Sequence, residues 1–103
     1  MKVKIPKEIR IGIHRVSIKY EKGMGDNFGK RGQARYGECE IPIDPEKSTD
    51  TKKTEALMHE LLHFIDDIYN SGRLEEYEIA TLANGISILL DDLGVEMDWS
   101  DII

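Results

Sequence analysis

The chain has 103 residues, of which 40% are hydrophobic and 33% charged, and its formal net charge is −6. This composition is typical of a globular protein, and the length predicts a single domain over residues 1–103. The negative charge argues against a nucleic-acid partner, whose phosphates would repel it, and no apolar run approaches the roughly 18 residues of a membrane span.

The single cysteine, Cys39, cannot form a disulfide within the chain. Residues 1–10 also lack the apolar stretch that a signal peptide requires. We therefore expect a cytoplasmic protein.

The first half of the chain has the pattern of short strands. Apolar residues alternate over Ile9–Tyr20 with one slip near His14, which predicts strands joined by a bulge or a turn. Four glycines in residues 22–32 predict a mobile connection. Strand formers return in Gln33–Asp44, where two prolines favour an edge strand or a strand exit.

The second half has the pattern of two helices. Several candidate N-caps lie in Ser48–Thr51, and the helix that follows should run to about Asn70, with Gly72 near its C-terminus. A second helix is expected over Glu75–Gly94, and the short connection predicts an antiparallel helical hairpin. The tail beyond it holds Trp99, and the pattern does not decide whether it packs on the core.

The first predicted helix contains the segment His59-Glu60-Leu-Leu-His63. At about 100° per residue the two histidines lie within roughly 40° of each other, on the polar side. Two imidazoles one turn apart are a zinc-binding pair, and Glu60 beside them is placed to act as a general base rather than as a ligand. The apolar residues of this helix fill one arc of roughly 160°: Leu57, Met58, Leu61, Leu62, Phe64, Ile65, Ile68 and Tyr69.

The second predicted helix offers a third ligand. Glu78 points toward the apolar stripe of this helix, where an unpaired carboxylate would be costly to bury. We therefore predict His59, His63 and Glu78 around one Zn²⁺, although this donor set also tolerates manganese, cobalt or iron. The stripe that orients Glu78 consists of Ile79, Leu82, Ile86, Leu89, Leu90 and Leu93.

Other acids remain open for the third position. Glu75 also falls on the inward side, although it is expected at the N-cap. Asp66 shares the histidine face, and its short side chain suits it better to accept an imidazole N–H than to bind the metal.

These residues resemble the zincin metallopeptidases. The HExxH helix after a small sheet carries the likeness, and Glu78-Ile-Ala-Thr-Leu-Ala83 resembles the E-A-N-x-F-A segment of ImmA/IrrE-type peptidases, with isoleucine and alanine in place of the usual alanine and asparagine. The layout is also similar to short phage-type zincin proteins. The resemblance implies an α+β fold, with a small N-terminal antiparallel sheet packed on two long helices, and implies Glu78 as the third zinc ligand.

The predicted function is zinc-dependent hydrolysis of peptide bonds, with a metal-activated water and Glu60 as general base. A peptide or protein substrate is expected to lie along an edge strand, for which Tyr36–Ile41 is the candidate. Tyr69 and Tyr77 are available to stabilise the oxyanion, although packing is the expected role of both. Two alternatives stay open: a zincin-fold binding module that holds metal without cleaving, and a structural domain without metal.

Overall fold

The structure is a computed structural model that describes residues 1–24, 31–46 and 48–103. It confirms the predicted α+β class. The elements are β1 (Lys2–Lys4), β2 (Glu8–Ile11), β3 (His14–Tyr20), β4 (Glu40–Ile43), α2 (Asp50–Asn70), α3 (Glu76–Asp92) and β5 (Glu96–Asp98). Of the glycine-rich connection predicted over residues 22–32, residues 25–30 lie outside the described part.

The main sheet has the order β2-β3-β4. A tight turn at Gly12, which has a φ of 63°, joins β2 and β3 into an antiparallel hairpin, as the slip near His14 predicted. The prediction of a wholly antiparallel sheet is wrong, because β4 pairs with β3 in parallel. A long connection separates these two strands and lets the chain return in the same direction. A second, two-stranded sheet pairs β1 with β5, also in parallel.

The outer side of β4 is covered by the segment Arg31–Arg35, called the edge segment below. Isolated antiparallel bridges join Gly32 to Ile43 and Arg35 to Glu40. Residues 36–39 form the turn between the two runs. The prediction that Tyr36–Ile41 is the exposed edge is therefore wrong, because the edge segment holds that position.

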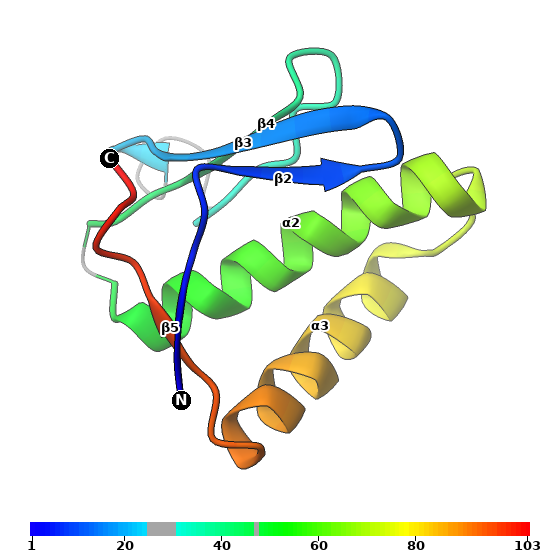
Figure 1. Ribbon diagram of the computed structural model, residues 1–103. Helices are drawn as coiled ribbons and strands as arrows, with labels where there is room; N and C mark the ends of the chain where they lie inside the picture. Colours follow the sequence, from blue (N-terminus) through cyan, green and yellow to red (C-terminus); the bar gives the residue numbers. More distant parts are fainter. Residues whose placement is uncertain (25–30, 47) are drawn as a thin grey trace.

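The elements form three layers, with α2 between the three-stranded sheet and α3 (Figure 1). From α2, Leu57 and Phe64 are almost fully buried, whereas Ile65 and Tyr69, which also belong to the predicted apolar arc, are 41% and 66% exposed. The buried core lies mainly between α2 and the sheets and comprises Ile5, Ile11, Val16, Ile18, Ile41, Ile43, Leu57, Phe64, Trp99 and Ile102.

The helix ends follow capping rules. The Thr49 side chain accepts a hydrogen bond from the Lys52 amide at 3.2 Å and begins α2, within the predicted N-cap region. The helix ends at Ser71, which adopts the left-handed conformation. Among the described residues, neither helix combines the length and the hydropathy that crossing a membrane requires.

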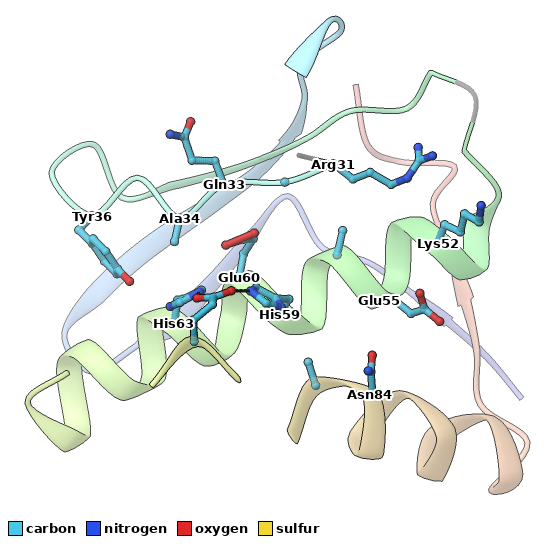
Figure 2. Close-up of a pocket in the computed structure, with 14 residues that line it drawn as sticks. Arg31, Gln33, Ala34, Tyr36, Lys52, Glu55, His59, Glu60, His63 and Asn84 are labelled. Carbon is cyan, nitrogen blue, oxygen red and sulfur yellow. Dashed lines mark hydrogen bonds and ion pairs between the residues drawn. The ribbon is translucent and has the colours of Figure 1, made fainter. Parts of the chain in front are cut away.

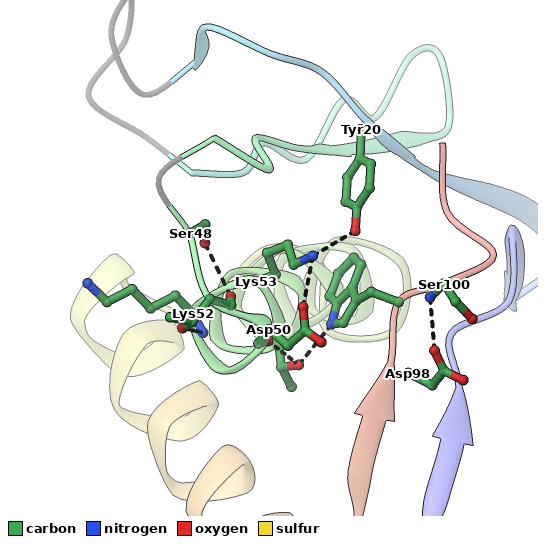
Figure 3. Close-up of polar contacts among 10 residues, drawn as sticks. Tyr20, Ser48, Asp50, Lys52, Lys53, Asp98 and Ser100 are labelled. Carbon is green, nitrogen blue, oxygen red and sulfur yellow. Dashed lines mark hydrogen bonds and ion pairs between the residues drawn. The ribbon is translucent and has the colours of Figure 1, made fainter.

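The C-terminal tail packs on the core. Trp99 is 4% exposed, and its indole N–H donates to Thr54 at 3.1 Å. Beside it, Lys53 donates to the Tyr20 hydroxyl at 2.7 Å and pairs with Asp50 at 3.0 Å (Figure 3). The Lys53 ammonium also lies over the rings of Tyr20 and Trp99, so these contacts join α2, β3 and the tail.

Candidate metal centre and active-site cleft

An open cleft of roughly 900 Å³ lies over the polar face of α2. The edge segment forms one wall, and the first turns of α3 form the other (Figure 2). Its lining residues are Arg31, Gly32, Gln33, Ala34, Tyr36, Lys52, Glu55, Ala56, His59, Glu60, His63, Glu76, Ala83 and Asn84.

The two histidines lie together on the floor of this cleft. Their ring centroids are 5.0 Å apart, and their side chains are 27% and 23% exposed. One ligand atom from each of His59, Glu60 and His63 lies within 4.8 Å of the other two, which is close enough for a single metal ion. The helical spacing of the motif predicted that the two imidazoles converge, with Glu60 beside them.

Glu76, the first residue of α3, contacts both histidines. The Nε2 atom of His59 lies 2.7 Å from its Oε1, within hydrogen-bond distance, and the Nε2 atom of His63 lies 2.9 Å from its Oε2. The Glu76 side chain is 67% exposed at the mouth of the cleft. A single carboxylate therefore joins the two imidazoles across the α2–α3 hairpin.

Glu78, the predicted third ligand, is engaged elsewhere. Its carboxylate accepts a hydrogen bond from the Glu75 amide at 2.8 Å, and the Glu75 side chain accepts from the Glu78 amide. The two residues form a capping box at the start of α3. Glu75 thus occupies the N-cap that the sequence predicted for it, and neither acid has a contact with the histidines in the described structure.

The difference arises from which face of α3 is buried. The fully buried positions are Ile79 and Ala83, whereas Leu82, which belongs to the predicted stripe, is 47% exposed. Glu76 lies within roughly 20° of Ala83 around the helix, and Glu78 lies roughly 140° away. The Glu75-x-x-Glu78 spacing at a helix start was the signal in the sequence for a capping pair.

The sequence suggested that Asp66 accepts a hydrogen bond from an imidazole. In the described structure its carboxylate has other partners. Its carboxylate accepts from the Asn70 side chain and from the Leu74 amide, and it is only 6% exposed. It lies near the end of α2, where it binds the connection between the helices, and it does not line the cleft.

Glu60 is buried beneath the edge segment, with 9% of its surface exposed. A Cβ atom added to Gly32 would lie 3.2 Å from the Glu60 Cγ and 3.4 Å from its Oε2. Glycine at position 32 therefore lets the strand backbone pass close over the carboxylate. This places Glu60 between the histidines and the wall of the cleft.

Tyr36 lines the cleft, whereas the sequence placed it only in the candidate substrate edge and named Tyr69 and Tyr77 for the oxyanion. Its ring packs on Phe64 with centroids 5.1 Å apart, and its side chain points from the turn toward His63 (Figure 2). Burial and the nearby carboxylates, including Glu60, raise its pKa above 10.0, so the hydroxyl keeps its proton. Tyr69 and Tyr77 are 66% and 71% exposed and do not line the cleft.

Comparison of the chain with known protein families, with curated proteins and with solved structures gives no significant match.

Proposed function

We propose that the protein is a zinc-dependent peptide hydrolase that works in the cytoplasm. The observation that carries the proposal is that Glu76 touches both histidines of the HExxH segment, in an open cleft that also contains Glu60. The likeness of the motif to the zincin peptidases supports the same reaction.

The residues present fit a metal ion. Two imidazole nitrogens and a carboxylate oxygen from Glu76 make a three-ligand set of the kind found in catalytic zinc sites, which keep a fourth position for water. We assign Glu76 rather than Glu78 to this set, because Glu76 already contacts His59 and His63. Zinc held there would lower the pKa of water and polarise the scissile carbonyl.

Glu60 is close enough to ligate the metal itself, but its position suits a general base better. It lies against Gly32, on the side of the cleft where a substrate backbone would approach. A carboxylate there can take a proton from the attacking water and then deliver it to the leaving amine. The burial of Glu60 limits the water around it, which favours proton transfer to the substrate over loss to solvent.

The edge segment is the proposed substrate-binding strand. Its Gln33 and Arg35 amides donate toward β4, at 3.3 Å to Pro42 and 3.0 Å to Glu40. In an antiparallel ladder, alternate residues direct their amides and carbonyls to opposite sides. Gly32 and Ala34 therefore direct theirs away from β4. An extended peptide can add there as a further strand, with its backbone over the metal ligands.

Tyr36 is placed to stabilise the oxyanion. Its hydroxyl can donate a hydrogen bond, and its side chain points toward His63 from the wall opposite α3. A preorganised donor aimed at the developing negative charge lowers the barrier of acyl transfer.

The test has two parts. Zinc content is measured by mass spectrometry on protein purified without chelator, and cleavage of a peptide library is then compared between the wild type and Glu60→Gln. The proposal expects bound zinc in both proteins and cleavage only in the wild type. Zinc without cleavage in either protein would favour the metal-holding binding module, and absence of zinc would favour a structural domain.

A further inference from the structure

We propose that Asp66 is a positioning residue that holds Glu76 over the histidine pair by fixing the turn between α2 and α3. This inference rests on the proposed function, because it takes Glu76 as a metal ligand. It assigns to Asp66 neither metal binding nor contact with substrate.

The Asp66 carboxylate accepts hydrogen bonds from the end of α2 and from the connection that follows it. Its Oδ1 accepts from the Asn70 side-chain amide at 2.8 Å and from the Leu74 backbone amide at 3.2 Å, and its Oδ2 lies 3.3 Å from the same Leu74 nitrogen. Its backbone carbonyl accepts from the Gly72 amide at 3.0 Å. Asp66 thus accepts hydrogen bonds from the backbone amides of Ser71, Gly72 and Leu74 after α2 ends, and it is almost fully buried.

The hydrogen bond from the Leu74 amide to Asp66 fixes where α3 begins. Leu74 precedes Glu76 by two residues, a length that spans at most about 7 Å. The capping box of Glu75 and Glu78 then sets the direction of the first helical turn. Little freedom remains between the Asp66 carboxylate and the backbone of Glu76.

Glu76 needs this support because it has little packing of its own. Its side chain is 67% exposed, so neighbouring side chains do little to restrict it. The imidazoles contact it from one side only, from α2. Its reach to both rings therefore depends on the position of its own backbone, which the turn determines.

The inference predicts that Asp66→Ala weakens zinc binding about 10- to 100-fold, as loss of an outer support does for other metal sites. Zinc affinity is measured by competition with a chromophoric chelator, and the ligand set is read from the visible absorption spectrum of the Co²⁺ form. Asp66→Asn, which retains one oxygen for the Leu74 amide, should bind zinc more tightly than Asp66→Ala. It also serves as the test variant if the alanine variant does not fold.

A double-mutant cycle separates this role from general destabilisation. If Asp66 acts through Glu76, the Asp66 substitution should change zinc affinity much less in a Glu76→Gln background. Tyr20→Phe, which removes the hydroxyl that Lys53 donates to, is the control for a structural loss outside the cleft and should leave zinc affinity unchanged.

Two results would overturn the inference while leaving the proposed function intact. The first is wild-type zinc affinity in a folded Asp66 variant. The second is an equal loss of affinity in the presence and absence of Glu76. If Glu76→Gln alone leaves zinc affinity unchanged, the ligand assignment in the proposed function fails, and this inference fails with it.

Discussion

The Nε2 atom of His59 and the Oε1 atom of Glu76 lie 2.7 Å apart, although 17 residues separate them in sequence. The contact joins the polar face of α2 to the first residue of α3. It exists because the helical hairpin returns the chain across the HExxH segment. The predictions that follow depend on this hairpin and on the edge segment opposite it.

Glu76→Gln should weaken zinc binding by more than the roughly 10- to 100-fold typical of losing an outer support, because it removes an anionic ligand. The thermal stabilisation that zinc confers should fall in parallel, since a ligand that binds only the folded state stabilises it by RT ln(1 + [L]/Kd). Chelator competition and melting curves with and without zinc measure both effects.

Glu78→Gln is the matched control for this substitution. Glutamine at this position can still complete a capping box with Glu75, so the helix start should be preserved. Zinc affinity should stay at the wild-type value. The reverse ranking, with Glu78→Gln the more damaging, would restore Glu78 as the third ligand.

Gly32→Ala should destabilise the protein by about 1–3 kcal/mol, because overpacking forces neighbouring side chains to move. The added Cβ would lie 2.9 Å from the Ile43 Cδ1 and 3.2 Å from the Glu60 Cγ. Peptide cleavage should also fall, because the side chains displaced by the added Cβ include Glu60, the proposed general base. Urea denaturation and peptide cleavage measure the two consequences.

A second substitution isolates the steric cause. Ile43→Val removes the closest atom, so Gly32→Ala should be less destabilising in that background than in the wild type. Gly37→Ala is the control, because a Cβ there meets nothing within 4 Å, and it should stay within about 0.5 kcal/mol of the wild type. Equal losses for Gly32→Ala in both backgrounds would contradict the steric explanation.

Tyr36→Phe should lower kcat by about 10²- to 10³-fold while changing KM and zinc affinity little, because an oxyanion donor acts mainly in the transition state. Tyr77→Phe serves as the control, since that residue is 71% exposed and lies outside the cleft. Steady-state kinetics on a cleaved peptide check the prediction. A rise in KM at constant kcat would instead make Tyr36 a substrate-binding residue.

The pairing of Glu21 with Arg35 should make the edge segment sensitive to acid. The hydrogen bonds from Arg35 lower the pKa of the Glu21 carboxyl below 4.5, against the opposing effect of its partial burial. A carboxyl with a lowered pKa in the folded state stabilises the fold fully above pH 4.5 and loses that contribution as the pH falls through the lowered value.

Arg35→Met should therefore have a lower free energy of unfolding than the wild type above pH 4.5, and the difference should shrink at lower pH. Urea denaturation at a series of pH values between 7 and about 3 measures it. A difference that stays constant on acidification would show that Arg35 stabilises the edge segment through packing rather than through its charge.

Several features could be predicted from local sequence because they depend on near neighbours. The spacing of His59 and His63 determined their convergence, since residues four apart share a helix face. The N-cap region of α2 and the turn near His14 followed from local rules. These features need no knowledge of what packs against them.

Only the tertiary structure decided which acid meets the histidines and which segment borders the cleft. The sequence pattern of α3 favoured Glu78, but the buried face of α3 is that of Ile79 and Ala83, which places Glu76 beside the histidines. The parallel pairing of β4 and its coverage by the edge segment were equally hidden. The acid that meets the histidines and the partner of β4 depend on contacts between elements separated in the chain, and periodicity within one element shows that a face is apolar without showing which neighbour covers it.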